Sequence, residues 1–334
     1  MARPDEMTTP VDRPSPRRGT LVGSTAVLLW ATLAALTTLS GDIPPFQLLA
    51  MSFTLAFLVG VGLWLWEAVA QPVVVASSFP QPQRVAPHVE QPIVVASSFP
   101  QPRRVALHMA RHFKLPPAVW ALGLYGLFGY HFAYFMALRN APPVEAGLIA
   151  YLWPLLIVLM SALLPGERLG GRQVAGALLG FAGAVLIVTK GQGLHFDEQY
   201  ALGYGFALAC AFIWSSYSVL SRRAGGVPTS AVGAFCGVTA ALALLCHLLF
   251  ETTVWPVGGQ WAAVVLLGLG PVGAAFYTWD YGVKRGNIQT LGALAYAAPL
   301  LSTLLLIALG LAEPTWVVAA ACGLIVGGAV IATR

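Results

Sequence analysis

The sequence GLIAYLWPLL at residues 147–156 returns as GALAYAAPLL at residues 292–301. Gly, Ala, Tyr, Pro and the two final leucines keep their places in both copies, 145 residues apart. Both copies lie inside long apolar segments, and a repeated membrane segment is typical of transporters built from two related halves. The repeat therefore predicts a duplicated membrane unit with a substrate path between its halves.

The composition is that of a membrane protein. Only 9% of the 334 residues are charged and 57% are hydrophobic, whereas a soluble surface needs far more charge. Apolar runs of about 20 residues, long enough to cross the hydrocarbon core as a helix, recur along the chain. We expect an all-α polytopic protein of the cell inner (plasma) membrane. The net charge of +5 is spread over short loops and indicates no nucleic-acid partner.

Apolar runs between charged residues predict ten membrane helices. We expect them near residues 21–40, 44–66, 117–138, 144–164, 173–189, 201–221, 229–250, 261–283, 288–310 and 314–333. If the N-terminus is inside the cell, 16 of the 18 Lys and Arg residues lie in inner segments. Only Arg139 and Lys190 then lie outside. Because Lys and Arg favour cytoplasmic loops, we expect both termini in the cytoplasm.

The offset of 145 residues has a topological consequence. It maps the third, fourth and fifth expected helices onto the eighth, ninth and tenth. A unit of five helices is odd, so its second copy enters the membrane from the opposite side. We therefore expect two inverted five-helix repeats, at residues 21–189 and 201–333.

Two segments lie outside these repeats. Residues 1–20 are polar and rich in Pro and Arg, and we expect a disordered cytoplasmic tail. Residues 67–116 interrupt the first repeat and hold a 20-residue tandem repeat, with VASSFPQP in both copies. Because frequent prolines oppose regular helices and central strands, we expect a disordered cytoplasmic loop without a role in transport. A docking or regulatory segment is the alternative.

Ionisable side chains inside the membrane are costly and often functional. His131 lies in YHFAY, between Tyr130 and Tyr134, on a face that offers both stacking surface and hydrogen bonds. The alternative is a histidine bonded to a neighbouring carbonyl. The Asp280 carboxylate could bind a proton or the ammonium group of a ligand. Asp280 and His131 are therefore candidates for proton or polar coupling. The alternative for Asp280 is a pair with Lys284, four residues further along the helix.

Two more aromatic groups lie near the centres of expected spans. Tyr151 and Trp153 precede Pro154, which frees a carbonyl one turn earlier and can act as a hinge. Trp214 is followed by Ser-Ser-Tyr-Ser. Trp30 is the weakest member of this set. Together these residues indicate an aromatic binding site.

The paired segments resemble the EamA-type repeats of the drug/metabolite transporter (DMT) superfamily. The shared features are the central proline, an acidic residue near the span exit (Glu167, Glu313) and a small-residue helix containing Gly-Ala-Val. YHFAY, YLWP and the Trp214 segment resemble YddG-type exporters of aromatic amino acids. This resemblance implies ten helices around a central cavity. The residues it implies as substrate-binding are Tyr130, His131, Tyr134, Tyr151, Trp153, Pro154, Trp214, Tyr296 and Pro299.

The resulting hypothesis is an inner-membrane exporter of amino acids, and of aromatic ones (Phe, Trp, Tyr) in particular. Two inverted repeats would alternate access to the site, with Pro154 and Pro299 as hinges. The alternatives are a carrier for another small metabolite or drug, and a sensor or scaffold without transport. A nucleotide-sugar or sugar-phosphate carrier is disfavoured, because it needs basic residues in its cavity. The expected partners are a small-molecule substrate and the lipid bilayer, with the oligomeric state left open.

An enzyme is disfavoured by the same sequence. An intramembrane aspartyl protease needs two aspartates, and Asp280 alone lies well within a span. A zinc protease needs two helical histidines four residues apart with a glutamate, and we find no such set. The four cysteines match no zinc or redox motif. We therefore expect no catalytic residue, no metal site and no cofactor.

Overall fold

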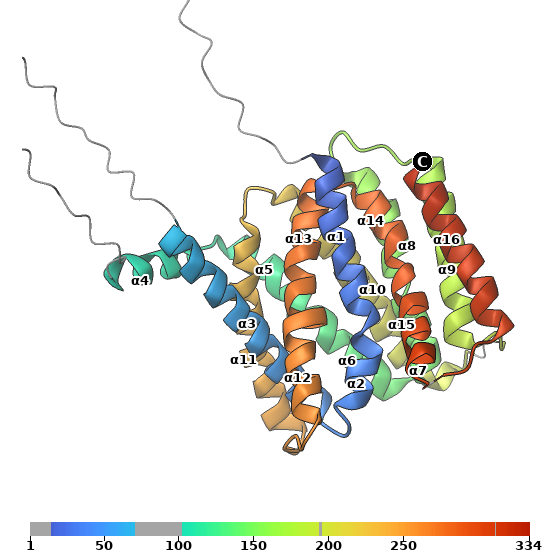
Figure 1. Ribbon diagram of the computed structural model, residues 1–334, viewed down its shortest axis with the longest axis horizontal. Helices are drawn as coiled ribbons and strands as arrows, with labels where there is room; N and C mark the ends of the chain where they lie inside the picture. The colour runs from blue at the N-terminus through green and yellow to red at the C-terminus, as the bar shows by residue number, and fades with distance from the viewer. Residues whose placement is uncertain (1–14, 71–101, 194–195, 311) are drawn as a thin grey trace, which may run out of the picture.

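The computed structural model describes residues 15–70, 102–193, 196–310 and 312–334 (Figure 1). These residues form helices and connecting loops, and they contain no strand. Ten segments in them are long and apolar enough to cross a membrane. They are Pro16–Leu39, Pro45–Val69, Pro117–Asn140, Pro143–Leu163, Gly171–Thr189, Glu198–Arg223, Thr229–Phe250, Gln260–Arg285, Ile288–Ala308 and Trp316–Thr333. The prediction of ten apolar helical spans is confirmed.

Some spans are essentially one helix and others are interrupted. The long helices are α3 (Pro45–Ala70), α9 (Gly171–Thr189), α10 (Ala201–Arg223), α11 (Val232–Phe250) and α16 (Trp316–Thr333). The helices of the interrupted spans are α1 (Pro16–Ala31), α2 (Leu33–Leu39), α5 (Pro117–Leu124), α6 (Tyr130–Asn140), α7 (Pro143–Ala150), α8 (Trp153–Met160), α12 (Gln260–Leu269), α13 (Ala275–Arg285), α14 (Ile288–Ala295) and α15 (Ala297–Ala308). Five short helical turns, η1 to η5, lie at span ends or inside spans.

The interruptions recur at the sequence offset. The π-helical turn η1 (Tyr125–Gly129) corresponds to η5 (Gly270–Ala274), and both turns begin and end 145 residues apart. The bounds of α6 and α13 differ by the same 145 residues, as do those of α7 and α14. The breaks after α7 and α14 lie just before Pro154 and Pro299. A proline has no N–H to donate, and its ring clashes with the carbonyl one turn earlier, so the helix is interrupted there. The two copies therefore share their local geometry.

The two copies of the repeated sequence also pack against each other. The Leu155 N–H donates a hydrogen bond of 3.1 Å to the buried Tyr296 hydroxyl. A side chain at Gly292 would place its Cβ 3.0 Å from the Pro154 carbonyl oxygen. Glycine at this position therefore allows α14 to approach the start of α8.

The chain begins and ends at one end of the bundle, which we call the terminal end (Figure 1). The Asn287 N–H, just after α13, donates to Thr20 Oγ1 at 2.9 Å. Arg172, at the start of α9, donates to the carbonyl of Arg334 at 3.2 Å. α1, α5, α9, α11 and α14 start at the terminal end, as Figure 1 lets the reader follow.

Two expectations of disorder are wrong in part. Residues 16–20 belong to α1, because Ser15 accepts a capping hydrogen bond from the Arg18 N–H and Pro16 suits the first helical position. In the expected loop 67–116, α3 continues to Ala70 and residues 102–111 form α4 (Pro102–Arg111). Beyond Pro102 this stretch has no further proline until residue 116, which permits a helix. The rest of the expected tail (1–14) and residues 71–101 lie outside the described residues.

Candidate substrate-binding site

Four tryptophans meet in the middle of the bundle. They come from four helices: Trp30 from α1, Trp153 from α8, Trp214 from α10 and Trp279 from α13. The ring centroid of Trp30 lies 5.9 Å from those of Trp153 and Trp214 and 5.1 Å from that of Trp279. Aromatic pairs attract one another at such separations. Both halves of the chain therefore contribute to one aromatic centre.

The indole N–H groups of these tryptophans differ in their partners. Trp30 donates to the Pro271 carbonyl at 3.1 Å, inside the π-helical turn η5. Trp279 donates to Ser218 Oγ at 3.0 Å. The N–H groups of Trp153 and Trp214 donate to no acceptor among the described residues. The centre thus keeps two hydrogen-bond donors that a ligand carboxylate can use.

His131 stands beside this centre and has a defined tautomer. Its Nδ1 lies 2.6 Å from the Leu127 carbonyl oxygen, one turn earlier. Because a carbonyl only accepts, Nδ1 carries the proton and Nε2 is left as an acceptor. The ring packs edge-on against Phe53 at 5.2 Å and Phe276 at 6.0 Å. The bond to a neighbouring carbonyl, considered from the sequence, is present, and the imidazole also joins the aromatic cluster.

Two tyrosines connect His131 to the tryptophans. Tyr130 and Tyr134 stack in parallel, with centroids 6.2 Å apart and an interplanar angle of 3°. Tyr130 also lies 5.4 Å from Trp214 and 5.1 Å from His131. Tyr151 lies at the end of α7, two residues before Trp153. The aromatic contacts thus bring together Tyr130, His131, Tyr134, Trp153 and Trp214.

Asp280 lies apart from this group and is paired. Lys284, four residues along α13, places its Nζ 2.8 Å from Oδ1 and 2.9 Å from Oδ2 of Asp280. Thr229 donates to Oδ2 at 2.7 Å, and Lys284 also donates to the Val227 carbonyl at 3.0 Å. Both charged side chains are buried. The pairing considered from the sequence as the alternative for Asp280 is the one present.

Tyr296 and Pro299 also lie outside the aromatic centre. Tyr296 packs between α8 and α9, with its ring 6.0 Å from Phe181 and against Gly180, where a Cβ would lie 2.7 Å from the phenol ring. Pro299 is buried in α15, and its carbonyl accepts a hydrogen bond from Thr303. Pro154 directly follows Trp153 at the break before α8.

Four members of the cluster were not among the residues expected to bind substrate. Trp30 was ranked weakest, and Trp279, Phe53 and Phe276 were not selected at all. A signal for two of them exists, because the offset of 145 residues maps Tyr134 on Trp279 and His131 on Phe276. Trp30 and Phe53 lie in the first and second spans, which the 145-residue offset does not align with later spans.

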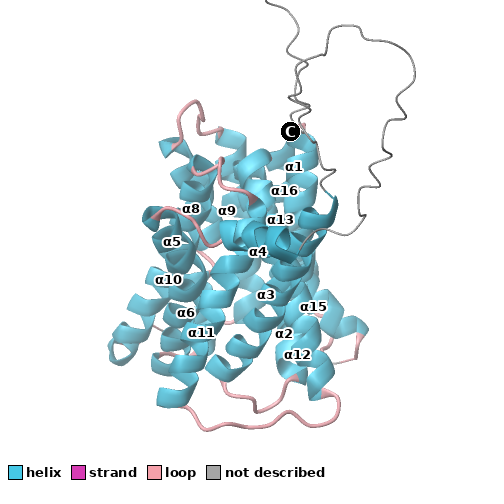
Figure 2. Cartoon of the chain, turned by 90° about the vertical axis from the view of Figure 1, so that its left-hand side faces the viewer, coloured by secondary structure: helices cyan, strands magenta, loops and turns pink. Residues whose placement is uncertain are grey.

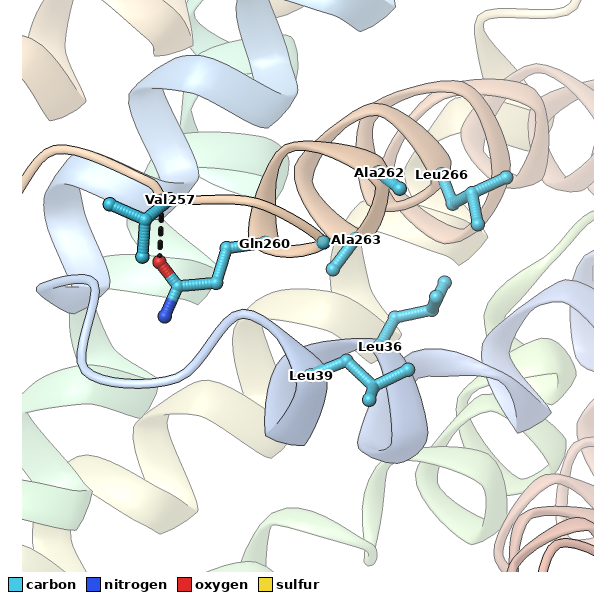
Figure 3. A pocket seen from close by; sticks show the side chains of 8 residues that line it. Leu36, Leu39, Val257, Gln260, Ala262, Ala263 and Leu266 are labelled. Carbon is cyan, nitrogen blue, oxygen red and sulfur yellow. Dashed lines mark hydrogen bonds between the residues drawn. The ribbon is translucent and has the colours of Figure 1, made fainter.

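Aromatic rings from several helices gather at the centre of the bundle, where we expect a cavity from the sequence. A hollow of about 370 Å³ lies between α2 and α12 (Figure 3), at the end of the bundle opposite the terminal end. Leu36, Leu39 and Leu266 line it. Its one polar side chain, Gln260, accepts a hydrogen bond from the Val257 N–H. This hollow offers no charged group to hold a zwitterion.

Ten apolar spans around a buried aromatic centre define the class of protein, a helical membrane transport protein. The model of the EamA-like transporter family matches residues 93–189 and 201–334. The chain belongs to this family of the drug/metabolite transporter superfamily. Its relatives are transporters and exporters, so the chain is a transporter and not an enzyme.

Individual relatives are similar over different lengths. The aromatic amino acid exporter YddG of Ancylobacter novellus is 51% identical over 315 residues, which are 94% of this chain and 96% of that protein. A protein of the same name from Escherichia coli is 27% identical over 169 residues, 48% of this chain and 57% of its own length. A solved crystal structure matches with a TM-score of 0.79 and 50% identity, covering 96% of this chain and 97% of its own.

Proposed function

We propose that this protein exports aromatic amino acids across the inner membrane. The observation that carries the proposal is the aromatic centre, in which Trp153 and Trp214 keep free indole donors. The name of the relative that is 51% identical over nearly the whole chain supports the same substrate class. A central group of large rings attracts another aromatic ring through stacking and edge contacts.

The polar groups of the centre suit the two ends of a zwitterion. The substrate carboxylate accepts hydrogen bonds from the indole N–H groups of Trp153 and Trp214. The substrate ammonium donates to Nε2 of His131, which the bond from Nδ1 to Leu127 leaves as an acceptor. Tyr130 and Tyr134 stack beside the substrate ring.

Alternating access of two inverted repeats gives the mechanism of transport. The recurrence of the π-helical turns and proline breaks at one offset supports a duplicated unit. The odd number of five helices in that unit supports its inversion. Pro154 and Pro299 act as hinges, since each lies in the first turn of the helix that follows a break, α8 or α15. The distribution of Lys and Arg supports an orientation with both termini in the cytoplasm.

In this mechanism, His131 is the residue that binds and releases the coupled proton. Asp280 already has a cationic partner, Lys284, and serves the structure. Replacing His131 by Gln removes the titratable group. If transport is proton-coupled, efflux driven by a pH gradient is lost in His131→Gln, while exchange of substrate at equal pH continues. Equal stimulation of both proteins by the gradient would exclude His131 as the coupling group.

The test of the proposed function is counterflow in proteoliposomes. Vesicles loaded with unlabelled Phe, Trp or Tyr should accumulate the labelled amino acid, whereas vesicles loaded with Ser or Glu should not. Trp316→Ala provides a matched control, because this tryptophan is 75% exposed and lies far from the centre in sequence and packing. Uptake no faster than that of protein-free liposomes would reject the substrate class.

A further inference from the structure

The end of α3 and the helix α4 bring three metal-ligating side chains together. Glu67 lies three residues before the end of α3, His108 lies in the last turn of α4, and His112 directly follows the end of that helix, four residues after His108. The Glu67 Oε2 atom lies 3.6 Å from Nε2 of His108 and 3.6 Å from Nε2 of His112. All three ligand atoms lie within 4.8 Å of one another. α4 runs across the direction of the spans, beside the end of α3 (Figure 2).

One atom of this cluster lacks the partner that buried polar atoms normally have. The Nε2 atom of His108 is buried and makes no hydrogen bond within the described chain. An unpaired buried nitrogen costs free energy, and native structures rarely keep one unless an ion or a water satisfies it. The carboxylate of Glu67 is partly exposed, which leaves an open side for a water ligand.

The second histidine is held in place by its surroundings. The His112 ring stacks on Trp64, with centroids 4.7 Å apart and an interplanar angle of 10°. Trp64 is fully buried and donates its indole N–H to the Ser230 carbonyl at 2.9 Å. Metal sites depend on such support, because a fixed ring orientation lowers the cost of ordering the ligand.

We propose that Glu67, His108 and His112 form a binding site for a transition-metal ion, Zn²⁺, with water as the fourth ligand. Two imidazole nitrogens and a carboxylate are ligands that Zn²⁺ prefers, whereas Ca²⁺ and Mg²⁺ take oxygen ligands. Tetrahedral coordination at about 2.0–2.1 Å places neighbouring ligand atoms roughly 3.3 Å apart. The two N–O separations of 3.6 Å come close to this value before any ion has drawn the side chains together.

The site has a structural consequence for the chain around it. A bound ion joins the last turn of α3 to the end of α4, so that it links residues 41 to 45 positions apart in the sequence. From the sequence we expected no metal site and found no pair of helical histidines with a glutamate. The proposed site differs from a zinc-protease set, because its glutamate comes from a different helix, 41 residues before His108.

The proposal is tested by calorimetry with Zn²⁺ alone. The full-length protein is purified in detergent with an affinity tag that lacks histidine and is stripped with a chelator. The expected result is one Zn²⁺ per chain, with binding at least tenfold weaker in His108→Gln, His112→Gln and Glu67→Gln. Leu107→Gln is the matched control, because it changes an exposed neighbour on α4 and leaves the three ligands intact.

Two results would overturn the site: no Zn²⁺ binding by the wild type, or equal binding by the His108→Gln/His112→Gln protein. Every variant is first checked by gel filtration and by phenylalanine counterflow without metal, which should match the wild type. If loss of the Trp64 contact unfolds His112→Gln, His108→Gln alone decides, because its Nε2 has no hydrogen bond to lose. Visible absorption of bound Co²⁺ then distinguishes tetrahedral coordination from loose surface binding.

Discussion

Trp153 shows how one residue joins the break in a helix to the substrate site. It is the first residue of α8, directly before Pro154, and only 7% of it is exposed. Its ring contacts Trp30, Trp214 and Trp279, so three other spans hold it in place. The counterpart in the second copy is Ala298. At the residue scale, we therefore propose that specificity depends on a position where the two copies differ.

Replacing Trp153 by Ala should reduce the initial rate of phenylalanine counterflow about tenfold or more. The variant loses several aromatic contacts, each worth about 0.5–1.5 kcal/mol, and a hydrogen-bond donor for the carboxylate. Trp153→Phe keeps most of the stacking but not the donor, and should give an intermediate rate. An unchanged rate in Trp153→Ala at equal protein content would remove this residue from the site.

The ion pair between Asp280 and Lys284 should stabilise the folded protein. Replacing Asp280 by Asn leaves the Lys284 ammonium buried without its counter-charge, which typically costs about 3–5 kcal/mol. The unfolding temperature in detergent should therefore fall. The double variant Asp280→Asn/Lys284→Met removes both charges and should recover most of the loss. Equal unfolding temperatures of wild type and Asp280→Asn would contradict a structural pair.

At the scale of the helical elements, Tyr296 stabilises the start of α8. Leu155 lies in the first turn of that helix, whose N–H groups have no partner within the helix. The Tyr296 hydroxyl accepts the Leu155 N–H, so the break in the second copy caps the helix that follows the break in the first. This contact links the two halves at their repeated sequences.

Tyr296→Phe should destabilise the protein by about 1–3 kcal/mol, because it leaves a buried N–H without a partner. Thermal unfolding followed by circular dichroism measures the change. Tyr125→Phe is the matched control, since Tyr125 is exposed and its bond to Ser216 lies on the outer surface. Because Tyr296 bonds to Leu155, next to the proposed hinge at Pro154, Tyr296→Phe should also change the rate of counterflow at temperatures where the variant remains folded.

At the scale of the whole molecule, charge at the two ends of the bundle indicates its orientation. Arg17, Arg18 and Arg334 lie at the terminal end, whereas Arg139 and Lys190 lie at the opposite end. The positive-inside rule assigns the basic end to the cytoplasm. A green fluorescent protein fused after Arg334 should therefore fluoresce, and alkaline phosphatase fused there should be inactive. An active phosphatase fusion would reverse the orientation.

The sequence by itself determined the ten spans, the 145-residue repeat and the breaks before Pro154 and Pro299. These features depend on local patterns of apolar residues and on the missing N–H of proline, which act in any helical bundle. Only the tertiary structure placed Trp30 and Trp279 in the aromatic centre, brought Tyr296 to the start of α8 and put Glu67 beside His108 and His112. Contacts between side chains of different helices depend on which helix faces pack together, and a local sequence pattern does not specify that packing.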